Sequence, residues 1–297
     1  MPPQLHVLLA GALFATGGAL LKGCDFPSLE RAGLRSLLAA IVILTILPEA
    51  RRWPTRRMLL LVPAFFAATC LFVVANTLTT AANAIFLQST APLWVSLLSP
   101  WLLRERAARA DLLVLVGIGA GMALVFAAPT AAVATAPNPR LGDAIAFGSG
   151  IGYALLLVGM RWLGRDGAAT DSRGAGEGPA AIAWGSIATA PLAFALMPVV
   201  GQTPILGSGR DWLAIGTLAV FQVGIAYALL VRAAARVPAL QVSLLLMIEP
   251  ALNPLLTMMV HDERPPAQAL AGGALIIGAV AVRCLVAARR TGRPAAG

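Results

Sequence analysis

The sequence predicts an all-α membrane protein with ten transmembrane helices in two inverted five-helix repeats. Three observations carry this prediction: the composition, the spacing of the charges and an internal repeat. Hydrophobic residues make up 59% of the 297 positions, charged residues make up 12%, and the mean hydropathy is +0.83. A soluble domain of this composition would lack the polar surface that water requires. The charges also cluster, which leaves uncharged runs such as residues 2–21. Such runs match the roughly 20 helical residues that cross a hydrocarbon core.

The internal repeat relates two stretches that lie 158 residues apart. At this offset Pro92 aligns with Pro250, and the pair Glu105-Arg106 aligns with the pair Glu263-Arg264. Each stretch has the length and apolar character of half a membrane crossing, so the repeat indicates a duplicated membrane protein. Five helices in each copy make the second copy enter from the opposite face, which is an architecture common among secondary transporters.

Ten helices account for the hydrophobic runs. The uncharged run of 46 residues, 58–103, would be about twice the bilayer thickness as one helix, so it must fold back. The polar stretch 76–83 supplies the Asn and Thr groups that suit a turn there. The predicted helices lie near residues 5–22, 31–48, 57–76, 83–103, 111–128, 141–163, 179–199, 211–231, 238–260 and 266–286.

These helices divide the chain into two repeats, at residues 5–128 and 141–286, and a basic cytoplasmic tail at 287–297. The hydrophilic linker 164–178 and the loop 201–210 make the second repeat longer. In both repeats, glycines at helical spacing, such as Gly117 and Gly121, fit close helix approach.

The net charge of +9 is a topology signal and does not indicate nucleic-acid binding. With both termini in the cytoplasm, 16 of the 22 basic residues fall on the inner side and six on the outer side. We therefore expect a multi-pass protein of the bacterial inner membrane, with the lipid bilayer as a partner and no nucleic acid. Three widely spaced cysteines and two isolated histidines predict neither disulfides nor a metal site, and nothing in the sequence calls for a cofactor.

Several short motifs resemble the drug/metabolite transporter superfamily, EamA type, over about residues 5–286. They are Leu34-Arg35 after Pro27, Gly142-Asp143, Tyr227 with Arg232 and Pro238-Ala239, Ile248-Glu249-Pro250, and the two Glu-Arg pairs. The resemblance implies ten helices in two repeats and a carrier driven by protons or another gradient. Such carriers often export amino acids, metabolites or drugs, and the resemblance does not identify the substrate.

Glu249 lies halfway along the ninth predicted helix, where an ionised carboxylate costs about 2.5–3.5 kcal/mol. Two interpretations stay open. Glu249 either couples proton and substrate occupancy, or hydrogen-bonds backbone that Pro250 or Pro254 leaves free. Ala91 stands at the equivalent place in the first repeat, so the role of Glu249 is asymmetric. The prolines at 92, 100, 250 and 254 are expected to kink helices 4 and 9, either to expose backbone to a central cavity or for packing alone.

Polar and aromatic residues near the depth of Glu249, or a turn or two from it, predict a substrate pocket that binds a partly apolar solute. Packing or lipid contact is the alternative for each residue alone. The predicted substrate-binding residues are Gln88, Trp94, Tyr153, Trp184, Gln222, Tyr227 and Asn253. Arg35 is placed about a turn inside the outer end of helix 2, where it binds a substrate carboxylate, snorkels to the interface or pairs with Glu30.

The sequence thus predicts a secondary transporter that exports a small metabolite by alternating access, with proton coupling through Glu249. An uptake permease of the same fold, a channel and a membrane-embedded enzyme are the alternatives. No catalytic cluster is visible, so we expect no enzyme activity. We expect a small-molecule substrate and a monomer or homodimer.

Overall fold

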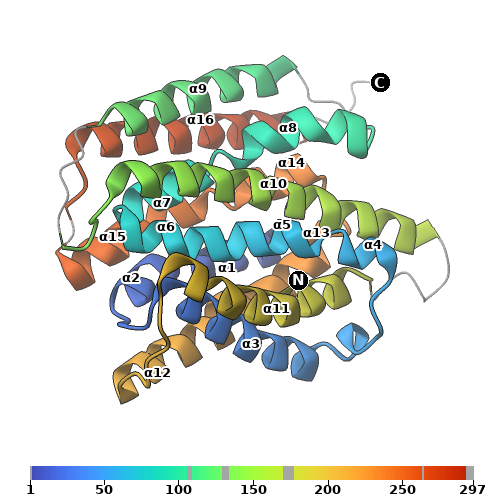
Figure 1. The fold of residues 1–297 in the computed structure, drawn as a ribbon. Helices are drawn as coiled ribbons and strands as arrows, with labels where there is room; N and C mark the ends of the chain where they lie inside the picture. Colours follow the sequence, from blue (N-terminus) through green and yellow to red (C-terminus); the bar gives the residue numbers. More distant parts are fainter. Residues whose placement is uncertain (1, 106–108, 129–133, 170–176, 263, 292–297) are drawn as a thin grey trace, which may run out of the picture.

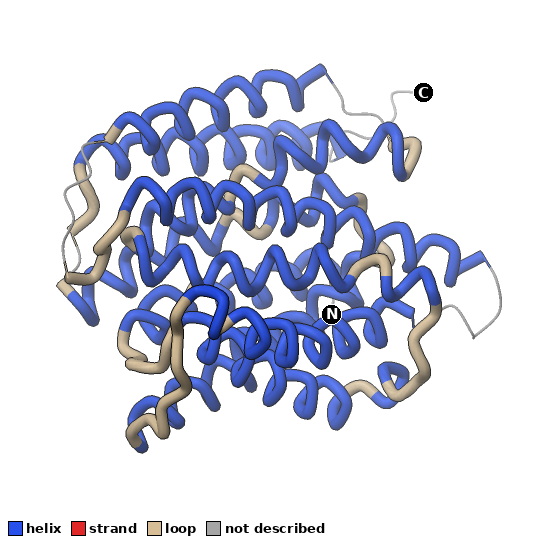
Figure 2. The backbone as a smooth tube through the Cα atoms, in the orientation of Figure 1, coloured by secondary structure: helices blue, strands red, loops and turns tan. Residues whose placement is uncertain are grey.

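The computed structural model describes residues 2–105, 109–128, 134–169, 177–262 and 264–291, and these form helices and loops without a strand (Figure 2). The helices form ten helical runs that lie side by side, and successive runs reverse direction (Figure 1). Arg106, Glu263, linker residues 170–176 and tail residues 292–297 lie outside the described residues. Residues 164–169 of the predicted linker continue α10 as helix.

Runs 1 to 5 begin and end within a few residues of the predicted helices. They are α1 (Pro3–Phe14) with α2 (Gly17–Lys22), α3 (Ser28–Ile46), α4 (Arg56–Leu59) through α5 (Val62–Phe66) to α6 (Phe72–Leu78), α7 (Ala81–Gln88) with α8 (Ala91–Leu102), and α9 (Arg109–Ala127).

Runs 6 to 10 form the second repeat, with corresponding helices in the same order. They are α10 (Pro139–Ala169), α11 (Glu177–Leu196), α12 (Gly209–Thr217) continued by α13 (Ala226–Ala234), α14 (Ala239–Leu245) with α15 (Ile248–His261), and α16 (Ala267–Thr291).

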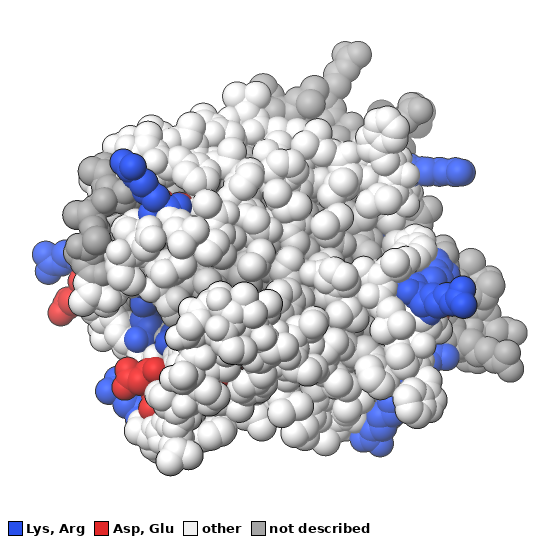
Figure 3. All heavy atoms as spheres, in the orientation of Figure 1, with Lys and Arg blue, Asp and Glu red and all other residues white. Residues whose placement is uncertain are grey.

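The bundle has the surface of a multi-pass membrane protein. Seven of the described runs are long and apolar enough to cross a membrane, and runs 5 and 10 contain shorter apolar helices. Run 2 falls outside this group because Glu30, Arg31 and Arg35 interrupt its apolar sequence. Charged side chains gather at the two ends of the runs, and an uncharged belt separates them (Figure 3). Such a belt suits a hydrocarbon core with water on both sides.

Packing between the runs follows the inverted repeat. Run 1 packs against run 8 through α1 and α13, and its counterpart, run 6, packs against run 3 through α10 and α6. Run 2 packs along run 7, and run 5 along run 10. Each copy therefore completes its core with helices of the other copy, so the two repeats form one body.

Both repeats interrupt the same runs. Runs 4 and 9 break just before Pro92 and Pro250, where the prolines remove backbone donors that a continuous helix would use. Runs 3 and 8 each contain a π-helical segment, Ala67–Leu71 and Leu218–Ile225. π-helical segments within α-helices are common at functional sites.

The predicted turn within 76–83 is confirmed, because run 3 ends at Leu78 and the Thr80 side chain accepts a hydrogen bond from Asn83 N.

Runs 5 and 10 cross at two glycines. A Cβ atom on Gly121 would lie 2.5 Å from the Gly272 carbonyl oxygen, and a Cβ atom on Gly272 would lie 2.5 Å from the Gly121 carbonyl oxygen. No atom lies within 4 Å of a Cβ atom placed on Gly119, one half-turn away on the same helix. Backbone contact of this kind leaves no room for a methyl group.

We predict that Gly121→Ala destabilises the protein by about 1–3 kcal/mol, because the methyl group must push two backbones apart. Gly119→Ala is the matched control and should be neutral or stabilising, since alanine favours helix by about 0.8–1.0 kcal/mol. The midpoint of thermal unfolding of each purified variant measures the difference. Equal midpoints for the two variants would show that the glycine crossing is not tight.

Candidate functional site

A small cavity lies near the middle of the bundle. It has a volume of about 30 Å³, which is room for about two water molecules. Every lining residue is buried, and runs 1, 2, 3, 4, 6, 8 and 9 all contribute to the wall. The lining residues are Phe14, Arg35, Ala68, Thr69, Phe72, Gln88, Tyr153, Gln222, Val223, Tyr227 and Glu249.

Five residues that the sequence singled out meet at this cavity. They are Gln88, Tyr153, Gln222, Tyr227 and Glu249, and they come from four different runs. They were predicted from their polar or aromatic side chains and from their depth, which is near the middle of the run or a turn or two from it.

The two predicted tryptophans lie away from the cavity. Trp94 packs edge-on against Phe147, with ring centroids 5.5 Å apart. Trp184 donates a 2.9 Å hydrogen bond from Nε1 to the Arg52 carbonyl oxygen and stacks on Trp53 at 6.0 Å. Neither ring lines the cavity wall.

Asn253 also stands apart from the cavity wall. Its side chain is fully buried, and neither amide atom has a hydrogen-bond partner among the described residues. A Cβ atom on Gly18 of α2 would lie 2.3 Å from Asn253 Oδ1, so the amide packs directly on the backbone of run 1.

The Arg35 guanidinium forms one side of the cavity. Arg35 is 2% exposed, Nη1 donates to Gln222 Oε1 at 2.8 Å, and Nη2 donates to the Thr69 carbonyl oxygen at 3.2 Å. The expected alternatives of snorkelling or pairing with Glu30 are wrong, because the Glu30 carboxylate instead accepts from Ile205 N at 3.0 Å. Run 2 begins three residues earlier than predicted, which places Arg35 two turns inside the helix.

Glu249 lies at the start of α15, directly after the break in run 9. Its side chain is 6% exposed and has no hydrogen-bond partner in the described part of the chain. Glu249 also lines a second cavity of about 10 Å³ together with Gln88 and Tyr153, and Ala91 lies on the wall of that cavity. The carboxylate therefore lies between two small cavities and does not bond to the backbone near Pro250.

Gln88 and the aromatic rings fix the remaining walls. Gln88 Nε2 donates to the Ala68 carbonyl oxygen at 3.0 Å and to Ser149 Oγ at 2.6 Å, which ties run 4 to the π-helical segment of run 3 and to α10. Phe14 packs edge-on against Tyr227 at 5.1 Å and against Tyr153 at 6.5 Å. Phe14 and Phe72 escaped the sequence prediction because apolar rings in an apolar helix carry no signal of which face they occupy.

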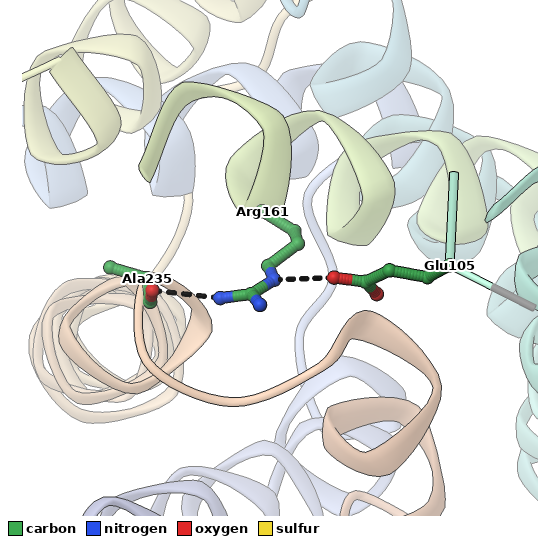
Figure 4. A network of polar contacts seen from close by, with 3 residues as sticks. All are labelled: Glu105, Arg161 and Ala235. Carbon is green, nitrogen blue, oxygen red and sulfur yellow. Dashed lines mark hydrogen bonds and ion pairs between the residues drawn. The ribbon is translucent and has the colours of Figure 1, made fainter. Parts of the chain in front are cut away.

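Polar contacts join helices at both ends of the bundle. At the end that holds loops 103–105 and 235–238, called the terminal end, Arg161 bridges Glu105 and Ala235 (Figure 4). Arg161 Nε lies 3.0 Å from Glu105 Oε1, and Nη1 donates to the Ala235 carbonyl oxygen at 2.8 Å. This bridge joins runs 4 and 6 to the connection between runs 8 and 9.

The opposite end, called the far end, carries buried acids. Asp143 accepts hydrogen bonds from Thr79 Oγ1 at 2.7 Å and from Asn83 Nδ2 at 3.2 Å. Asp211 accepts from the backbone nitrogen of Asp25 at 2.7 Å. These contacts join runs 3, 4 and 6 on one side and runs 1 and 8 on the other, so polar contacts hold the helices together at both ends of the bundle.

The comparisons with known proteins agree with this architecture. The profile of the EamA-like transporter family matches twice, over residues 2–127 and 140–283. A crystal structure described only as that of a protein is similar over 97% of both chains, with 21% sequence identity and a TM-score of 0.69. No curated protein matches the chain. Because the two profile matches cover nearly the whole chain, one for each repeat, the chain belongs to the EamA-like transporter family.

Proposed function

We propose that this protein is a secondary active transporter of the bacterial inner membrane that exports a small metabolite, amino-acid-like or drug-like, by alternating access. The observation that carries the proposal is the central cavity, whose wall is built from buried residues of both repeats and holds a carboxylate without a hydrogen-bond partner among the described residues. Transporters with inverted repeats place their substrate sites at the repeat interface near the bilayer midplane. Both termini lie in the cytoplasm in this proposal, so the terminal end is the inner end.

The small size of the cavity supports alternating access. About 30 Å³ holds water but no metabolite, so substrate enters only when one end of the bundle opens. The helix breaks in runs 4 and 9 and the π-helical segments in runs 3 and 8 supply points where these runs can bend. A channel has no need of such bending points in both repeats.

Glu249 supplies the coupling group in this mechanism. A buried carboxylate without a partner favours its neutral form, and it ionises more readily when water or a cation reaches it. Opening one end of the cavity would therefore change its affinity for a proton. Proton release on one side and uptake on the other would then drive solute movement.

The first experiment identifies the substrate. Thermal-shift measurements on purified protein with amino acids, sugars, nucleosides and cationic drugs identify solutes that bind. Each hit is then tested for counterflow in proteoliposomes. Saturable counterflow supports a carrier, whereas an unsaturable conductance points to a channel.

We predict that Glu249→Gln abolishes flux driven by a pH gradient and preserves solute counterflow, because the amide keeps the shape of the site and cannot release a proton. Asp143→Asn is the matched control, since it neutralises a buried acid at the far end that does not line the cavity. It should lower stability and leave pH-driven flux intact. If pH-driven flux survives in the Glu249 variant, the coupling role is refuted.

We also predict that Glu105→Gln shifts the protein toward opening at the terminal end, because it removes the ion pair with Arg161. The reporter is Ala68→Cys on the cavity wall, in a variant without native cysteines, and its alkylation rate is measured with a maleimide. A partly exposed pair worth about 0.5–1 kcal/mol predicts roughly two- to fivefold faster labelling.

The control for this measurement is Glu49→Gln, which removes a looser pair with Arg232, 3.7 Å apart and more exposed. Its labelling rate should match that of the parent. Equal rates in all three proteins would mean that the Arg161 bridge does not hold the terminal end closed.

A further inference from the structure

Run 2 carries two buried arginines one turn apart, and the structure uses them differently. Arg31 donates from Nε and Nη2 to the Phe26 carbonyl oxygen and from Nη1 to the Leu21 carbonyl oxygen, so its guanidinium caps the backbone near the far end. Arg35 faces the cavity, and its Nε has no partner among the described residues. Arg31 is thus a structural arginine, whereas Arg35 has an unused hydrogen-bond donor at Nε.

Arg35 also lacks an acidic partner. Its two acceptors, Gln222 Oε1 and the Thr69 carbonyl oxygen, are neutral, and no carboxylate in the described residues lies within ion-pair distance of it. A buried guanidinium stays charged, and burying a charge without a counter-charge is costly. The cavity wall therefore carries a positive charge, on Arg35, that an incoming anion can neutralise.

We propose that Arg35 binds a carboxylate of the transported solute. The proposal rests on the transport function proposed above and adds the chemical class of the substrate. A planar guanidinium binds a carboxylate through two parallel charge-assisted hydrogen bonds, which are stronger than bonds to neutral acceptors. Arg35 meets this requirement through the free Nε and one Nη group that exchanges its neutral acceptor.

The walls beside Arg35 fit an apolar body on the same solute. Phe14, Phe72, Tyr153 and Tyr227 bring four rings to the cavity. Aromatic rings stabilise apolar and aromatic groups through burial and edge contacts. The substrate class is therefore a small organic acid with an apolar or aromatic body.

Binding at Arg35 would also change contacts with both repeats. The Thr69 carbonyl belongs to the π-helical segment of run 3, and Gln222 belongs to that of run 8. A carboxylate that displaces either acceptor releases one of these segments from Arg35. Substrate occupancy would thereby loosen the contact that joins the two repeats at the cavity.

The test uses two probes of the same shape, 3-phenylpropionate and its neutral amide, 3-phenylpropanamide. Affinities are measured by isothermal titration calorimetry on the full-length protein in nanodiscs near neutral pH. We expect the carboxylate to bind on the order of tenfold to a hundredfold more tightly than the amide. Arg35→Met should abolish this preference.

Arg31→Met is the matched control, because it removes a buried guanidinium from the same helix without touching the cavity. It should lower stability and keep the preference. If Arg35→Met does not fold, Gln222→Leu serves as the second variant. It removes a competing acceptor, so the preference for the carboxylate should increase.

Three results would overturn the proposal: equal binding of the two probes, no binding of the carboxylate at about 10 mM, or an unchanged preference in Arg35→Met or in Gln222→Leu. Failure here is distinguishable from failure of the transport function. Saturable counterflow of a neutral or cationic solute would retain the carrier and exclude the role of Arg35 in binding an anion.

Discussion

The contact on which the site depends is the buried guanidinium of Arg35 between two π-helical segments. These segments widen runs 3 and 8 and turn backbone carbonyls and side-chain amides toward the centre of the bundle. Arg35 bonds to Thr69 of one segment and to Gln222 of the other, while Gln88 and Ser149 both bond to the Ala68 carbonyl. A single cation thus joins the two repeats at the wall of the cavity, and every proposed step changes what surrounds it.

The two repeats have equivalent backbones but different side chains at the cavity. The backbone is symmetric, since both repeats break at the same proline, carry a π-helical segment in the third run and end the second run in a 3₁₀ turn, Pro48–Ala50 and Pro198–Val200. This equivalence gives the bundle two related ways to open. The side chains are asymmetric, because Glu249 stands where the first repeat has Ala91. In this account the symmetric backbone allows both ends of the bundle to open, and the unmatched residue Glu249 supplies the proton-binding group.

The sequence predicted the ten helices, the fold-back within residues 76–83 and the duplication, because membrane thickness and proline chemistry act on local sequence. It also predicted the depth of each residue along its helix, and the predicted residues Gln88, Tyr153, Gln222, Tyr227 and Glu249 line the cavity. It did not predict which face each side chain occupies, because a helix that is apolar all round shows no polar stripe. Trp94, Trp184 and Asn253 were predicted on the same grounds and do not line the cavity. Arg35 was placed too near the membrane surface because the predicted helix began three residues late.

The central claim is that the two ends open in turn around one central cavity. Spin-label distances test it most directly, with one pair at Leu102 and Arg236 of the terminal end and a nearly equivalent pair at Val260 and Thr77 of the far end. Electron paramagnetic resonance measures both pairs with and without a pH gradient across proteoliposomes. The account predicts that one distance lengthens when the other shortens. Two distances that lengthen together, or that never change, would contradict it.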